Sequence, residues 1–129
     1  MEKISKSMKH WRIFSFVVAI FVAVLIFAMS SISLSAETGN YFVNIKALGY
    51  HLGIFFFLAF FLIFAIAPRT RKGFLFLVLL LLSYGVLDEF HQFFVPGRAM
   101  TFFDIWVDFI GILFGAVFWL GWQDWQKEE

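Results

Sequence analysis

The amino-acid sequence predicts an all-α integral membrane protein, a bundle of four transmembrane helices that forms one domain over residues 1–129. Hydrophobic residues make up 62% of the chain and charged residues only 15%, whereas soluble domains average about 45–50% and about 25%. Four apolar stretches approach the roughly 20 residues that a spanning helix needs. They cover about residues 13–32, 48–67, 74–94 and 103–122. The net charge of +1 gives no reason to expect nucleic acid as a partner.

The connections between these stretches follow from their polar residues. Four basic residues precede the first stretch and small residues ending at Ala36 follow it, a pattern that resembles a secretory signal peptide. The apolar run is longer than the roughly 7–15 residues of a signal peptide, so we expect an uncleaved first helix. A loop over 33–44 leads to the second helix, and Pro68 to Gly73 form a tight connection to the third. The third helix reaches spanning length only by continuing through the polar residues 88–92.

Basic residues are distributed unevenly between the two ends of this bundle. Eight of the ten lie in the N-terminal segment, in the loop between the second and third helices, and in the C-terminal tail. The opposite side holds only Lys46 and Arg98. Because lysine and arginine favour the cytoplasmic side, we predict a multi-pass protein of a bacterial cell membrane with both termini in the cytoplasm.

Ionisable residues gather at the outer ends of three helices and in the loop between the third and fourth. Charges at a helix centre cost about 2.5–3.5 kcal/mol each on insertion scales and usually mark function. We predict that they converge on one cavity open to the outer leaflet, where Asp108 is the deepest and has a polar partner. The candidate ligand-binding residues are Lys46, His51, Asp88, Glu89, His91, Gln92, Arg98, Asp104 and Asp108.

Small residues predict where helices approach one another closely. Asp108 shares one stripe of the fourth helix with Gly111 and Gly115. A pair of glycines four residues apart lets another helix come near, so this stripe should face the inside of the bundle. The second helix carries a similar pair, Gly49 and Gly53. Such faces also leave open self-association of the chain into a homo-oligomer.

Some of the polar residues also have structural interpretations. Thr101 suits the N-cap of the fourth helix, with Asp104 three residues on in an arrangement that resembles a capping box. Arg98 could pair with Asp88 or Glu89 and simply hold the loop down. Asp88 and Glu89 point about 100° apart on the third helix, so the two acids need not serve one purpose.

The segment from Tyr84 to Gly115 resembles the VanZ-like family of membrane proteins. The resemblance rests on the combination of D-E-x-H-Q, P-G-R and two later aspartates, and it extends upstream. The matching residues are Ser30, Ser31, Lys46, His51, Tyr84, Asp88, Glu89, Phe90, His91, Gln92, Pro96, Gly97, Arg98, Thr101, Asp104, Asp108, Gly111 and Gly115. The family's founding member is linked to low-level teicoplanin resistance in Gram-positive bacteria, and no reaction is firmly assigned to the family. The resemblance implies a site near lipid-linked cell-wall precursors.

Two kinds of binding function fit this pattern. A membrane protein that binds or modifies the envelope would meet the phosphate of a membrane lipid or lipid-linked precursor with Arg98, Lys46 and His91. A metal site is the other, because the spacing of Asp88 and His91 resembles that of helical carboxylate sites, with Asp104 or Asp108 to complete it. The sequence identifies no cofactor.

An intramembrane enzyme that modifies a lipid headgroup is the alternative. Glu89 or His91 would be its general base, and Arg98 would stabilise developing negative charge. Asp88 or Asp104 would orient the histidine. No serine nucleophile stands in a fixed motif, so this hypothesis depends on the acid–base residues, and the sequence leaves open whether the protein is an enzyme.

Overall fold

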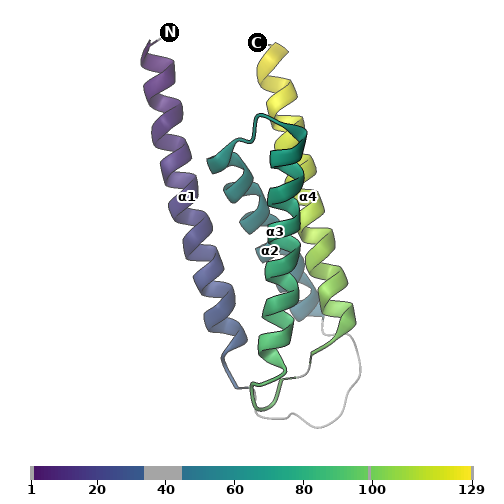
Figure 1. Cartoon of the computed structure of the whole chain (residues 1–129). Helices are drawn as coiled ribbons and strands as arrows, with labels where there is room; N and C mark the ends of the chain where they lie inside the picture. Colours follow the sequence, from purple (N-terminus) through teal and green to yellow (C-terminus); the bar gives the residue numbers. More distant parts are fainter. Residues whose placement is uncertain (1, 34–44, 99, 129) are drawn as a thin grey trace.

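Four α-helices, each long and apolar enough to cross a membrane, make up the computed structural model of the chain (Figure 1). The structure describes residues 2–33, 45–98 and 100–128, and every regular element in this part is helical. The helices are α1 (Glu2–Ser30), α2 (Ile45–Ile66), α3 (Arg71–Gln92) and α4 (Phe102–Glu128). They alternate in direction, so the two ends of the chain lie at the same end of the bundle. The predicted four-helix membrane fold is confirmed.

The first and last helices are longer than the predicted apolar stretches. α1 begins at Glu2 instead of near residue 13, and α4 continues to Glu128 instead of ending near residue 122. Hydropathy marks only the part of a helix that lipid surrounds, whereas the backbone hydrogen bonds continue into polar residues. The loop predicted over 33–44, including Ala36, lies outside the described residues apart from Ser33.

The ends of α3 are set by its flanking residues. The helix begins at Arg71, because the Thr70 hydroxyl oxygen accepts a hydrogen bond from the Gly73 N–H at 3.1 Å and caps the first turn. It ends at Gln92, two residues before the predicted end near residue 94. Pro96 follows closely, and proline has no N–H with which to continue a helix.

The closest contact between helices joins α2 and α4. A Cβ atom added at Gly111 would lie 2.5 Å from the Leu52 carbonyl oxygen, and one at Gly115 would lie 2.5 Å from the Phe56 carbonyl oxygen. Only glycine allows such an approach of the two backbones. The prediction that this stripe of α4 faces inward is therefore confirmed. The buried core beside it includes Phe55, Ala59, Ile63, Ile112, Ala116 and Trp119.

The glycine pair of α2 has a different environment. A Cβ atom at Gly49 or Gly53 would have no described atom within 4 Å. The pair therefore makes no close helix contact within the described chain, unlike the pair in α4. Of the two glycine faces that the sequence offered for self-association, the α4 face is already covered by α2.

Polar contacts attach α1 to the rest of the bundle. The Arg12 guanidinium donates hydrogen bonds to the carbonyls of Ala65 at 2.9 Å and Ile66 at 2.8 Å. These carbonyls lie in the last turn of α2, where helix carbonyls lack partners within their own helix. Further along α1, the Tyr84 hydroxyl donates to the Ala23 carbonyl at 2.7 Å.

Large apolar side chains cover the outside of the bundle. Phe21, Phe76 and Phe102 are 65%, 65% and 79% exposed, and the outward faces of all four helices carry similar residues. A soluble monomer rarely exposes continuous apolar patches, whereas lipid-facing helices are apolar all along their length. The chain is a multi-pass membrane protein.

Replacing Gly111 with alanine should destabilise the bundle by about 1–3 kcal/mol, because the new methyl group forces α2 and α4 apart. Thermal unfolding in detergent measures the effect. Gly121→Ala is the matched control, since a Cβ atom there would meet no described atom within 4 Å. Equal melting temperatures for Gly111→Ala and the unsubstituted chain would contradict the close contact.

Candidate functional site

The buried polar side chains are concentrated near one end of the bundle. Apart from Ser15, those of the described residues lie where α1 and α3 end and where α2 and α4 begin. This is the end opposite the chain termini (Figure 1). They form two groups, one made by α2, α3 and α4 and the other by α1 and α3. The buried residues concerned are Ser30, His51, Asp88, Glu89, Gln92 and Asp108.

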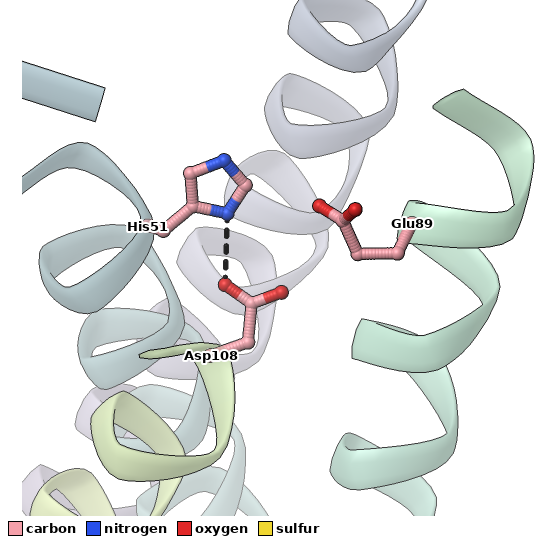
Figure 2. A group of neighbouring side chains, drawn as sticks. All are labelled: His51, Glu89 and Asp108. Atoms are coloured by element: carbon pink, nitrogen blue, oxygen red, sulfur yellow. Dashed lines mark hydrogen bonds and ion pairs between the residues drawn. The ribbon is translucent and has the colours of Figure 1, made fainter. Parts of the chain in front are cut away.

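The first group, the three-helix centre, consists of His51, Glu89 and Asp108. The Nδ1 atom of His51 lies 2.9 Å from Oδ1 of Asp108, and both side chains are buried. A carboxylate can only accept, so the His51 Nδ1–H donates this bond. Figure 2 shows the Glu89 carboxylate facing this pair from α3. One ligating atom from each residue lies within 4.8 Å of the others.

Small residues bring the three helices of this centre together. The contact of Gly111 with the backbone at Leu52 sets the neighbouring His51 against α4. A Cβ atom at Gly85 would lie 3.5 Å from the Cβ of Asp108, so α3 also approaches α4 closely. The prediction that Asp108 has a polar partner is confirmed, because its fully buried side chain is bonded to His51. Glu89 is buried to the same extent.

The three-helix centre is not fully satisfied internally. Oε1 of Glu89 and Oδ2 of Asp108 are buried and have no hydrogen-bond partner. The other Glu89 oxygen, Oε2, accepts the backbone N–H of Thr101 at 3.1 Å. An unpartnered oxygen in an apolar interior costs about 1–3 kcal/mol. Two such oxygens at one site mark it as a place where a proton, a cation or a hydrogen-bond donor can bind.

The start of α4 is capped as the sequence predicted. The Asp104 N–H donates to the Thr101 hydroxyl oxygen at 3.0 Å, and that hydroxyl donates to Oδ2 of Asp104 at 2.6 Å. Thr101 is thus the N-cap, and the Asp104 carboxylate fixes the orientation of its hydroxyl group. Because the Thr101 N–H also holds Glu89, the cap connects the start of α4 to the three-helix centre.

The second group, the Asp88 network, consists of Ser30, Asp88 and Gln92. The Ser30 hydroxyl donates to Oδ1 of Asp88 at 2.6 Å, and the Gln92 amide donates to Oδ2 at 3.0 Å. Both carboxylate oxygens are therefore satisfied, as expected for a group that joins α1 to α3. Asp88 and Glu89 serve different groups, as their spacing indicated.

Arg98 corrects one expectation. In the described part of the chain its guanidinium pairs with neither Asp88 nor Glu89. It donates instead to the carbonyls of Met29 at 2.8 Å and Ile32 at 3.2 Å. Met29 lies in the last turn of α1 and Ile32 just after the helix, where carbonyls accept bonds from outside the helix, and the planar fork of arginine suits two carbonyls at once.

His91 lies outside both groups. Its Nε2 atom is 3.0 Å from the Ser31 hydroxyl oxygen, and its ring packs on Phe27 at a centroid distance of 4.6 Å. Since the Ser31 hydroxyl donates to the Phe27 carbonyl, the bond to His91 uses the histidine N–H as donor. The metal ligands suggested from the sequence were Asp88 and His91 with Asp104 or Asp108. Among the described residues, the three potential ligands that lie close enough for one ion are instead His51, Glu89 and Asp108.

Sequence reasoning missed or misplaced several partners. Ser30 was noted only as part of the family pattern, yet it is the partner of Asp88. A glycine one turn before the acidic pair, Gly85, could have indicated from the sequence that another helix approaches α3 closely at this point. The backbone of Lys46 belongs to α2, and its side chain lies outside the described structure.

A double-mutant cycle should show that His51 and Asp108 depend on each other. His51→Leu and Asp108→Leu should each cost about 3–5 kcal/mol, because each leaves a buried partner uncompensated. The double substitution should cost less than the sum by about 0.5–3 kcal/mol. Unfolding in detergent gives these values, and a second cycle of Asp108→Leu with the exposed Phe76→Leu should be additive. Additivity in the first cycle would contradict the pairing.

Comparison with known families agrees with this architecture. A model of the VanZ/LLP1 family matches residues 4–123. The matched region includes both polar groups and nearly the whole of all four helices. Searches against curated proteins and against solved structures found no match. The resemblance noted from the motif residues is confirmed, and the chain belongs to the VanZ/LLP1 family.

Proposed function

We propose that the protein acts on or with the headgroup of a membrane lipid or a lipid-linked envelope precursor at the outer leaflet of a bacterial cell membrane. The orientation follows from the basic residues, which favour the cytoplasm for both termini. In that orientation, the end of the bundle that carries the three-helix centre faces outward.

The unpartnered oxygens of Glu89 and Asp108 are the observation that carries this proposal. If these polar residues only held helices together, we would expect each of their oxygens to have a hydrogen-bond partner within the protein, as both Asp88 oxygens do. Ionisable residues inside a membrane are costly and usually mark a binding or reaction site. Because Arg98 is engaged by α1, recognition of the headgroup falls to the three-helix centre.

An apolar groove nearby favours an amphipathic ligand. It has a volume of about 280 Å³ and runs between α1, α2 and α3. Tyr84 and Leu87 line it. Tyr84 precedes Asp88 by one turn of α3, and Leu87 directly precedes Asp88 in the chain. An acyl chain in this groove would bring a lipid headgroup toward the polar end of the bundle, an arrangement like that of ligand pockets, which are mostly apolar with a few placed polar groups.

Acid–base catalysis on the headgroup is the second candidate, and the bond between His51 and Asp108 favours it. With Nδ1–H held by Asp108, the second ring nitrogen of His51 can accept a proton, and Figure 2 shows it on the side away from Asp108. An oriented histidine of this kind typically contributes about 10²–10⁴-fold to a rate. This candidate uses His51 as base and Asp108 to orient it, in place of His91 and Asp88.

Altered susceptibility to teicoplanin would be the cellular consequence. The drug carries an acyl chain and acts on lipid-linked cell-wall precursors at the outer leaflet. A family member that binds or modifies lipids in that leaflet would change how the drug meets its target. We therefore propose a role in resistance to lipoglycopeptides.

Single cysteines should report the proposed orientation, because the chain has no cysteine of its own. Phe94→Cys, in the loop between α3 and α4, should react with a membrane-impermeant maleimide on intact cells. Arg69→Cys, in the loop between α2 and α3, should react only after the cells are opened. The reverse pattern would contradict the outer-leaflet assignment.

Substitutions in the three-helix centre should abolish function without unfolding the protein. Glu89→Gln keeps an oxygen for the Thr101 N–H, and His51→Gln keeps a polar side chain. In a susceptible Gram-positive host, the unsubstituted chain should raise the inhibitory concentration of teicoplanin and co-purify with a lipid identifiable by mass spectrometry. Both variants should lose these two properties.

The controls for this experiment separate loss of function from loss of fold. Asp124→Asn, at the opposite end of α4, should behave like the unsubstituted chain, and melting curves of all variants are recorded in detergent. Reconstituted protein that converts the lipid with time would identify an enzyme, whereas stoichiometric retention without conversion would identify a binding protein. Retained lipid and resistance in folded Glu89→Gln and His51→Gln proteins would refute the proposal.

A further inference from the structure

The three-helix centre has the composition of a metal site. An imidazole and two carboxylates come from three different helices, and one ligating atom of each lies within 4.8 Å of the others. Around Zn²⁺, ligand atoms at about 2.0–2.2 Å lie roughly 3.3–3.6 Å from one another. One possible ligand atom of each residue lies within 4.8 Å of the others. If Nδ1 of His51 is the ligand, binding of the ion would release the Nδ1 proton and replace the hydrogen bond to Asp108.

The free oxygens of the centre are an independent indication. Glu89 and Asp108 are both 0% exposed, and each keeps one oxygen without a partner. Two buried carboxylates that each have only one oxygen satisfied are costly in an apolar interior. One divalent cation would neutralise both and would give each free oxygen a partner.

We propose that His51, Glu89 and Asp108 bind one divalent transition-metal ion, Zn²⁺ or Mn²⁺. The imidazole favours a transition metal over Mg²⁺ or Ca²⁺, which take oxygen ligands almost exclusively. Three protein ligands leave a coordination position open for water or a substrate oxygen, as in catalytic zinc sites. The bond from the Thr101 N–H to Oε2 of Glu89 would hold that ligand in place, as outer hydrogen bonds do at metal sites.

The ion would also reconcile an acidic centre with an anionic ligand. Two carboxylates alone repel a phosphate, whereas a divalent cation between them cancels their charge and offers its open position to a phosphate oxygen. This link to the headgroup rests on the proposed function, and metal binding itself does not. A phosphate on a lipid and free inorganic phosphate share this chemistry.

The test measures metal on the purified full chain alone. Protein without an affinity tag is stripped with EDTA, exposed to Zn²⁺ or Mn²⁺ and freed of unbound metal by gel filtration. Elemental analysis should find about one ion per chain, because three ligands define one site. Co²⁺ in its place should give visible absorption bands that report its coordination geometry. Unsubstituted protein that retains no metal and gives no cobalt bands would overturn the proposal.

Variants assign the ion to these residues. His51→Gln, Glu89→Gln and Asp108→Asn should each weaken binding by about tenfold or more. The matched controls His10→Gln and Asp124→Asn remove the same chemical groups at the other end of the bundle and should bind normally. Binding that survives in all three centre variants would also refute the site.

Adding vesicles to the loaded protein separates the two proposals. The loaded protein should retain vesicles whose lipid headgroups carry an anionic phosphate and should not retain vesicles with neutral headgroups. EDTA treatment should abolish this retention, and free phosphate should compete with it. Metal binding without lipid retention would count against the proposed function alone. Lipid retention by metal-free protein would count against the metal link alone.

Discussion

The close approach of α2 and α4 is the constraint on which the polar site depends. Gly111 and Gly115 let the two backbones meet, and this distance sets His51 within hydrogen-bond reach of Asp108. A larger residue in either place would separate the helices and leave the aspartate without its partner. Packing and chemistry therefore share the same stripe of α4, which explains why its small residues and its acid occur at helical spacing.

Two arginines donate hydrogen bonds to backbone carbonyls at or near the end of a helix to which they do not belong. Arg12 of α1 binds carbonyls at the end of α2, and Arg98 binds carbonyls at the end of α1. Backbone groups without partners are especially costly where lipid excludes water. The first contact is made ten residues inside α1, at Arg12, and the second where the helix ends, so polar bonds hold α1 at two separate places while most of its length faces lipid.

The sequence was sufficient for the class, the four spans, the inward stripe of α4 and the burial of Asp108. Each of these depends on hydropathy or helical spacing, which are local properties. It was not sufficient to identify His51 as the partner of Asp108, because that depends on which helices are neighbours. Nor could it predict the partners of Arg98, since every residue has a carbonyl and nothing in the side chains marks those at a helix end. The choice of possible metal ligands also depends on which helices are neighbours. Asp88 and His91 are near in sequence, but they bond to Ser30 and Ser31, and the described side chains close enough to share an ion come from three other positions.

The connectivity of the polar contacts fixes the order in which they can form during synthesis. Arg12 meets its partners once the first two helices are present. Ser30 has to wait for Asp88, and His51 for Asp108, the last of these residues to be made. The nascent α1–α2 hairpin thus carries polar groups whose partners are supplied only by the second hairpin. The Asp88 network can form once α3 is present, whereas the three-helix centre has to wait for α4, and a chain that stops before α4 has no such centre at all.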